Sequence, residues 1–116
     1  MNPFEHVPPH ILAQLANNRK PYTLLILYKA ENYALPTTQK IIQSEHLPYL
    51  FDLREKGIVL IAMPVMDEGR VAAIAVYQST DKEEVRAYIE NDPAVKQGIF
   101  TYEILSAMGM KGDGLR

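Results

Sequence analysis

Four short runs of aliphatic and aromatic residues alternate with polar segments along the chain, and each has the length and composition of a β-strand. The runs cover residues 22–29, 58–65, 70–79 and 99–105. Residues 66–69 (MDEG) form a short polar turn between the second and third runs. Such a tight connection predicts that these two strands form an antiparallel hairpin.

Two segments between the strands have the apolar spacing of helices. The first covers residues 37–56, with an expected buried side of Ile41, Ile42, Leu47, Leu50, Phe51 and Leu53. Pro48 interrupts this segment, so either one helix kinks near residues 44–48 or the main helix begins around His46. The second segment opens at residues 80–83 (TDKE), which have the form of a capping box, and ends at Asn91-Asp92-Pro93.

The chain is expected to hold one domain, residues 21–106, between two smaller pieces. Residues 1–20 are an N-terminal extension with one short helix after its prolines, which packs on the body or across to a partner chain. The glycine-rich sequence from Ser106 predicts a loose tail, and residues 107–116 are therefore assigned to a flexible C-terminus.

The predicted element order, β-α-β-β-α-β, is that of a ferredoxin-like α+β fold with a four-stranded antiparallel sheet. Two helices cover only one face of such a sheet, and the other face is normally polar. Here both faces are apolar. In the second strand, simple alternation places Ile58, Leu60 and Ala62 on one face. It places Val59, Ile61 and Met63 on the other face. An exposed apolar face predicts a two-fold homodimer, in which the same face of a second copy covers it.

Composition narrows the classes of function. The chain has no cysteine, which excludes disulfides and thiolate chemistry, and its formal charge of −2 gives no electrostatic reason to expect nucleic acid. No P-loop, GxGxxG or GxSxG motif is present, so no cofactor and no metal are expected. No run approaches the roughly 20 apolar residues of a membrane span, and the N-terminus is unlike a signal peptide. The expected location is the cytoplasm.

Three short motifs follow one another in an order that carries a family likeness. Residues 46–50 (HLPYL) lie in the first long helix, Asp67-Glu68-Gly69 lies in the hairpin, and Asp92-Pro93 precedes the last strand. Together they resemble the YciI-like, or YCII-related, family over about residues 21–106. The chain departs from the family pattern at Met63, where a glycine is frequent before the proline, and at Ala94, where an aromatic residue is frequent.

The resemblance implies a dimeric α+β barrel, in which two sheets face each other, and a small enzyme with a histidine and an aspartate at its active site. The matching positions are His46 and Asp92. Asp92 ends the second helix at the edge where the first begins, so the two side chains can meet. A carboxylate bonded to one imidazole nitrogen leaves the other nitrogen as a base. In the alternative reading, Asp92 only terminates a helix and His46 is a packing residue.

Other polar residues are weaker candidates. Tyr49, Arg54 and Tyr28 are possible substrate-binding residues, and Arg54 would suit a carboxylate. The alternative is that they are solvated or lie at the edge of the core. His6 and His10 have the spacing of two metal ligands on a helix, but prolines lie between them and a tail without metal is favoured. Asp67 and Glu68 are interpreted as solvated turn residues.

We expect a cofactor-independent enzyme that uses His46 as a base, oriented by Asp92, on a small organic substrate that is possibly aromatic or lactone-like. Isomerisation, elimination and hydrolysis all remain open. One alternative is a non-catalytic module that binds a small ligand, and another is an interaction subunit. An enzyme needs the His46–Asp92 contact and an open pocket, a binding module needs only the pocket, and an interaction subunit needs neither.

Overall fold

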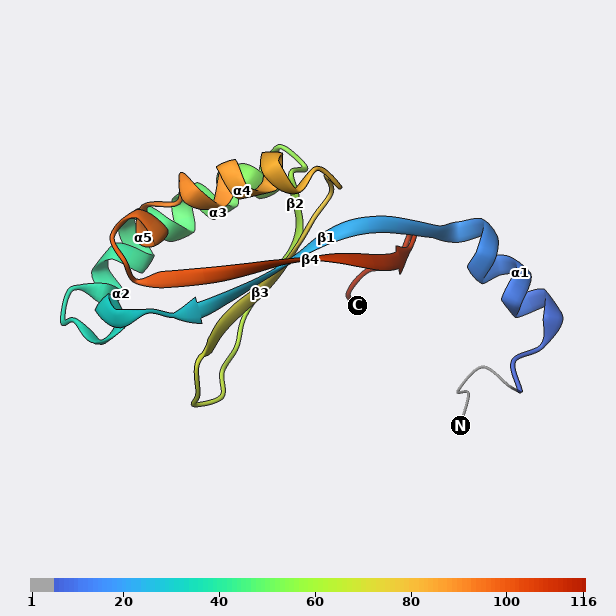
Figure 1. Cartoon of the computed structure of the whole chain (residues 1–116), viewed down its shortest axis with the longest axis horizontal. Coiled ribbons are helices and arrows are strands. Elements are labelled where there is room, and N and C mark those ends of the chain that lie inside the picture. Colours follow the sequence, from blue (N-terminus) through green and yellow to red (C-terminus); the bar gives the residue numbers. More distant parts are fainter. Residues whose placement is uncertain (1–5) are drawn as a thin grey trace.

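The computed structural model describes residues 6–116 as a four-stranded sheet with a helical layer and a projecting arm (Figure 1). In chain order its elements are α1 (Pro9–Asn18), β1 (Arg19–Lys29), the 3₁₀-helix η1 (Glu31–Ala34), α2 (Thr38–Ile41), the π-helix η2 (Ile42–His46), α3 (Leu47–Glu55), β2 (Val59–Pro64), β3 (Val71–Tyr77), α4 (Lys82–Glu90), α5 (Pro93–Lys96) and β4 (Phe100–Met110).

The strands lie in the order β2-β3-β1-β4, and each neighbouring pair is antiparallel. The helices α2 to α5 all lie on one side of this sheet (Figure 1). This arrangement confirms the predicted ferredoxin-like α+β fold, with β1 between its two long-range partners. None of the helices in residues 6–116 has the length and apolar character that crossing a bilayer requires.

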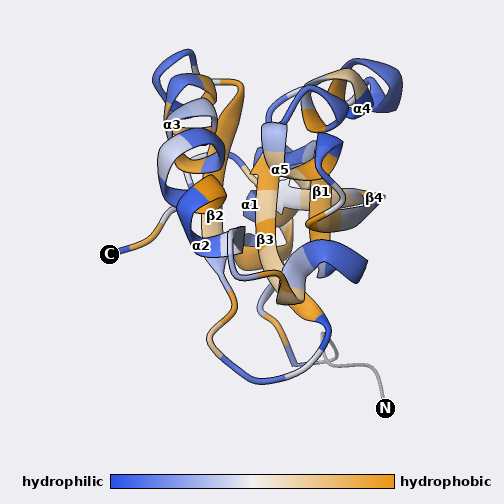
Figure 2. Ribbon diagram, turned by 90° about the vertical axis from the view of Figure 1, so that its left-hand side faces the viewer, coloured by the Kyte–Doolittle hydropathy of each residue, from blue (hydrophilic) through white to orange (hydrophobic). Residues whose placement is uncertain are grey.

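The core lies between the helical layer and the sheet. Leu25 and Leu27 of β1 are about 5 % exposed and point toward the helices, where they meet Val85 and Ile89 of α4 and Leu53 of α3. Figure 2 shows this distribution, with hydrophobic residues concentrated on the central strands and hydrophilic residues on the outer sides of the helices. The alternation along β1 therefore places its even-numbered residues on the face without helices.

A β-bulge in β2 changes the predicted faces of that strand. Val59 pairs with Tyr77, but the next paired residue, Ile61, is opposite Val76, so Leu60 is the extra residue. Val59 and Ala62 therefore lie on the same side as the buried residues of β3. The simple alternation predicted for residues 58–63 was wrong here, because period-2 reasoning does not anticipate an inserted residue.

The first helical segment runs without a break from α2 through η2 into α3, which decides between the two predicted arrangements. Pro48 has no N–H and cannot donate to the carbonyl of residue 44, so the regular α-helical ladder fails at this point. The N–H of Leu47 instead donates to the carbonyl of Ile42, a five-residue spacing that belongs to a π-turn. Most of the predicted buried side is confirmed, but Phe51 is 56 % exposed, because the π-turn rotates the residues after it.

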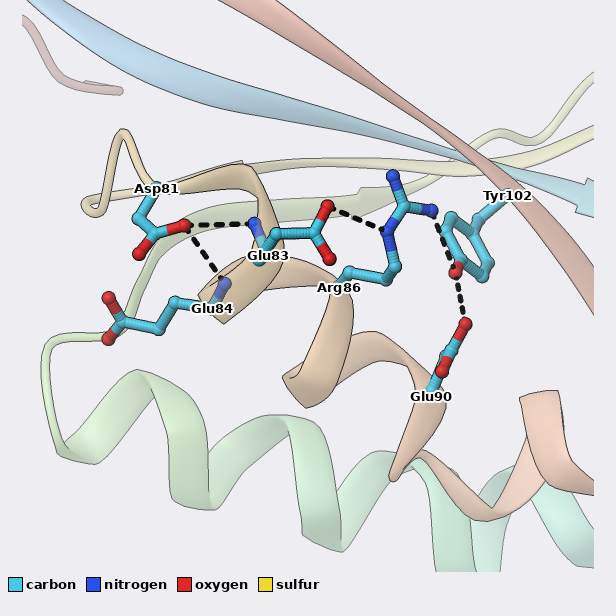
Figure 3. A network of polar contacts seen from close by, with 6 residues as sticks. All are labelled: Asp81, Glu83, Glu84, Arg86, Glu90 and Tyr102. Carbon is cyan, nitrogen blue, oxygen red and sulfur yellow. Dashed lines mark hydrogen bonds and ion pairs between the residues drawn. The ribbon is translucent and has the colours of Figure 1, made fainter.

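Helix α4 is tied to β4 by a polar network (Figure 3). Tyr102 donates a hydrogen bond to Glu90 Oε1 at 2.7 Å and accepts one from Arg86 at 3.3 Å. The helix begins with Asp81 as its N-cap, whose carboxylate accepts from the N–H groups of residues 83 and 84. The predicted capping box, with Thr80 as the cap, was therefore displaced by one residue.

Strands β1 and β4 pair along their whole length, from Arg19 opposite Met110 to Lys29 opposite Phe100. β3 pairs with β1 only over residues 23–28, so the other end of the β1–β4 ribbon projects from the body and carries α1 (Figure 1). The radius of gyration is 16.7 Å, compared with about 13 Å for a compact domain of 100 residues. The loose tail predicted from residue 106 was wrong for residues 106–110, because cross-strand pairing orders them despite Gly109.

Gly98, just before β4, lies in close contact with Asn32, and a substitution there tests this contact. Its φ is +74°, and a Cβ atom there would lie 2.8 Å from Asn32 Nδ2, which donates to the carbonyl of Gln97. Gly57 has a similar φ of +72° but nothing within 4 Å. We expect Gly57→Ala to lower the free energy of unfolding by about 1 kcal/mol through backbone strain alone. Gly98→Ala should cost distinctly more in urea denaturation, and equal losses would show that Asn32 moves away without cost.

Candidate active site

His46 is the last residue of the π-turn η2, and it is directed into the molecule. Only 7 % of the residue is exposed, and its ring packs edge-on against the ring of Phe100, with the two centroids 5.3 Å apart. The π-turn that precedes Pro48 ends at His46, and the ring of His46 lies against Phe100 of the sheet. π-turns of this kind are frequent at functional sites.

Asp92 approaches the same point from the neighbouring helical segment, at the end of the helical layer where α5 lies beside η2, next to α2 (Figure 1). It lies between α4 and α5 as the N-cap of α5, where its Oδ1 accepts a hydrogen bond from the N–H of Ala94 at 2.9 Å. Its Oδ2 lies 2.6 Å from Nδ1 of His46. The residue is 7 % exposed, so this carboxylate is buried with both of its oxygens partnered.

This geometry determines the hydrogen-bonding state of the imidazole. An ionised carboxylate only accepts hydrogen bonds, so His46 donates through Nδ1–H and, when neutral, carries its lone pair on Nε2. Every deeply buried polar side-chain atom among the described residues has a hydrogen-bond partner there, whereas His46 Nε2 has none. Nε2 is therefore not deeply buried and is in contact with solvent.

A cavity of about 510 Å³ adjoins His46, between the helical layer and the sheet. Its volume falls within the range of small-molecule sites. Most of its lining is apolar, and it includes Leu50 from α3, Leu27 from β1, Ala75 from β3 and Phe100 from β4. Met63, the first departure from the family pattern, is also part of the lining.

The three predicted substrate-binding residues lie elsewhere, and none of them lines this cavity. The hydroxyl of Tyr49 donates to the carbonyl of Tyr88 at 2.6 Å, and burial is the main reason that its pKa is raised to about 12. Tyr28 donates to Glu103 Oε1 on the opposite face of the sheet. Arg54 is exposed beside the ring of Phe51. In this chain the structure therefore brings together His46 and Asp92, but not their predicted helpers.

The structure also shows where the candidate metal ligands and the acidic turn residues lie. His6 precedes α1, which begins at Pro9, so His6 and His10 do not share a helix. Asp67 and Glu68 are exposed turn residues, although both contribute to the mouth of the cavity. Within residues 6–116, no group of three histidine or acidic side chains is arranged to hold a metal ion.

Sequence reasoning missed three residues that line the cavity, namely Lys29, Tyr33 and Phe100. Lys29 follows Leu25 and Leu27 at the spacing of two that places residues on one face of a strand, so this signal was available. Phe100 is the register partner of Lys29 on β4. Tyr33 belongs to the short 3₁₀-helix η1, and no periodic signal in the sequence identifies it.

The family comparison agrees with the fold and the motifs. The model of the YCII-related domain matches residues 22–107, which is most of the chain. The chain belongs to the YCII-related domain family. In this YCII-related domain, the match includes both His46 and Asp92, and it leaves α1 outside.

The solved structures that are similar to the chain include 5-chloro-2-hydroxyhydroquinone dehydrochlorinase (TftG) from Burkholderia phenoliruptrix AC1100, in complex with 2,5-dihydroxybenzoquinone. The YCII-related domain is 22% identical to it, the match covers 78% of this chain and 95% of the neighbour, and the TM-score is 0.47. No curated protein matches the chain in sequence.

Asp81 and Asp92 both act as N-caps, so comparing their substitutions measures how much the His46–Asp92 contact contributes to the free energy of unfolding. Asp81→Ala removes an exposed cap and should cost about 1 kcal/mol of unfolding free energy. Asp92→Ala removes a cap of the same type and also leaves the buried Nδ1–H of His46 without an acceptor, so it should cost about 3 kcal/mol or more. Urea denaturation of both variants checks this expectation. Equal losses would mean that the buried contact adds nothing to the cap.

Proposed function

We propose that this YCII-related domain is a small enzyme in which His46 removes and returns a proton on a small organic substrate held in the adjoining cavity. The observation that carries the proposal is the orientation of His46, whose Nδ1 is held by Asp92 while its Nε2 has no hydrogen-bond partner among residues 6–116. Family membership and the cavity support it further.

The chemistry follows from the different roles of the two imidazole nitrogens of His46. Neutral His46 takes a proton from the substrate on Nε2, and the positive charge that then develops on the ring is stabilised by the carboxylate of Asp92, 2.6 Å from Nδ1. The ring returns the proton to another substrate atom or to a leaving group in the second half of the reaction. Phe100 supports the ring from the side, so the base keeps its direction.

Two substitutions separate the base from its support. His46→Asn places an amide N–H near the position of Nδ1, so it can still donate to Asp92 while it lacks any atom at Nε2. In Asp92→Asn, the amide oxygen can still cap Ala94, but the amide N–H₂ then faces Nδ1 of His46. His46 must accept through Nδ1, so its proton moves to Nε2 and the base is lost.

The test incubates the protein in heavy water with small enolisable ketones, lactones and hydroxylated aromatic compounds, and follows deuterium uptake or ring opening by mass spectrometry. The wild-type chain should convert at least one of these compounds, and His46→Asn and Asp92→Asn should reduce the rate by about 10²-fold or more. Glu45→Gln, next to His46 on an exposed position, is the control and should keep the rate. Conversion that survives in His46→Asn would exclude His46 as the base.

A non-catalytic binding module is the alternative function, because a cavity of this size would equally hold a ligand that is not converted. If the chain binds compounds of the panel and converts none of them, the binding module is the better description.

We also propose that the helix-free face of the sheet packs against the same face of a second copy. Leu24 and Ile26 of β1 and their register partners Val76 and Ile74 form the centre of this face, and in the single chain they are only half-buried. Light scattering at micromolar concentration should give twice the mass of the chain. Ile26→Asp should yield monomers or insoluble protein, whereas Glu103→Gln, at the exposed margin of the face, should leave the mass unchanged. A wild-type monomer would contradict the proposal.

A further inference from the structure

Lys29 is the one lysine or arginine among the described residues that line the cavity at His46. It is half-buried at the end of β1, and among the described residues no carboxylate lies within 4.0 Å of its Nζ. Its register partner on β4 is Phe100, the residue on which the His46 ring packs. A half-buried ammonium group without a counter-ion, in a largely apolar wall, is a position where an anion gains a strong, charge-assisted contact.

The neighbouring side chains hold Lys29 in this direction. Its Nζ lies 5.4 Å from the centroid of the Tyr33 ring, a cation–π contact, and Tyr33 also lines the cavity. The rings of Tyr33 and Phe100 are 6.0 Å apart, and those of Phe100 and His46 are 5.3 Å apart. Lys29 and His46 therefore stand at the two ends of this series of contacts, in which the rings of Tyr33 and Phe100 form an aromatic wall of the cavity.

Resting on the proposed proton transfer, we propose that the substrate is a small anionic molecule, and that Lys29 binds its negatively charged oxygen while the acidic proton faces His46. The aromatic wall suits a flat, apolar body between the two ends. The same ammonium group would stabilise negative charge that develops on that oxygen when His46 takes the proton. The substrate class is thus narrowed to carboxylates, phenolates and acidic enols.

Two carboxylates that line the cavity would repel an anionic ligand, so the experiment includes a variant without them. Asp67 and Glu68 lie on the β2–β3 loop at the mouth of the cavity, where both are exposed. If they turned inward in solution, they would neutralise Lys29 and the cavity would not prefer an anion. Their removal in the double variant D67N/E68Q should otherwise strengthen anion binding only modestly, because exposed charges are screened by solvent.

The experiment measures binding of benzoate and of benzamide, which have nearly the same shape but differ in charge. Chemical shifts of the amides around Lys29 and His46 report the binding in neutral buffer at low salt. The wild-type chain should bind benzoate about tenfold more tightly than benzamide. Lys29→Met should abolish this preference and Lys29→Arg should largely keep it. Lys40→Met changes the net charge equally, at an exposed lysine of α2 outside the cavity lining, and should keep the preference.

Equal binding of benzoate and benzamide by the wild-type chain would overturn the proposal, including the case in which only D67N/E68Q prefers benzoate. It would also be overturned if Lys29→Met kept the preference, or if Lys40→Met lost it to the same extent. The result is independent of turnover, since His46→Asn should still prefer benzoate. Anion preference without proton transfer would leave Lys29 in a binding module, and proton transfer without anion preference would leave His46 as a base for neutral substrates.

Discussion

Strand β1 pairs with both β3 and β4, and the rest of the structure depends on this position. The strand is flanked on both sides, its odd-numbered residues from Thr23 to Leu27 lie buried under the helical layer, and Leu25 and Leu27 belong to the core. The same alternation, two residues further along, brings Lys29 to the cavity and sets it opposite Phe100. The sheet register therefore places the cation beside Phe100, on which the ring of His46 packs.

The His46–Asp92 contact connects two parts of the helical layer that are 46 residues apart in the chain. Each partner has a local reason for its position: His46 ends the π-turn that precedes Pro48, and Asp92 caps the short helix α5. A buried carboxylate needs both of its oxygens satisfied, and the cap supplies only one partner. The imidazole supplies the other, so the same bond stabilises the packing of the helices and orients the proposed base.

Several features were predictable because they depend on neighbours in the sequence. Short apolar runs gave the four strands, and proline and glycine marked most ends of the elements. The motifs around residues 46–50 and 92–93 identified the two residues that the structure brings within 2.6 Å. Errors arose where a distant partner decides the outcome. Leu60 is displaced by pairing with β3, residues 106–110 are ordered by β1, and the hydroxyl of Tyr49 is directed to the carbonyl of Tyr88.

By itself the sequence determined the fold class, the family and the pair His46–Asp92, since strand periodicity, turn residues and short motifs are local properties of the chain. Only the tertiary structure decided which groups surround that pair. The positions of Lys29, Tyr33 and Phe100 along one cavity wall depend on the register of β1 against β4 and on the packing of η1, which no local pattern specifies. A side chain's partner is set by such long-range pairing, because strands distant in sequence can place their residues within contact distance.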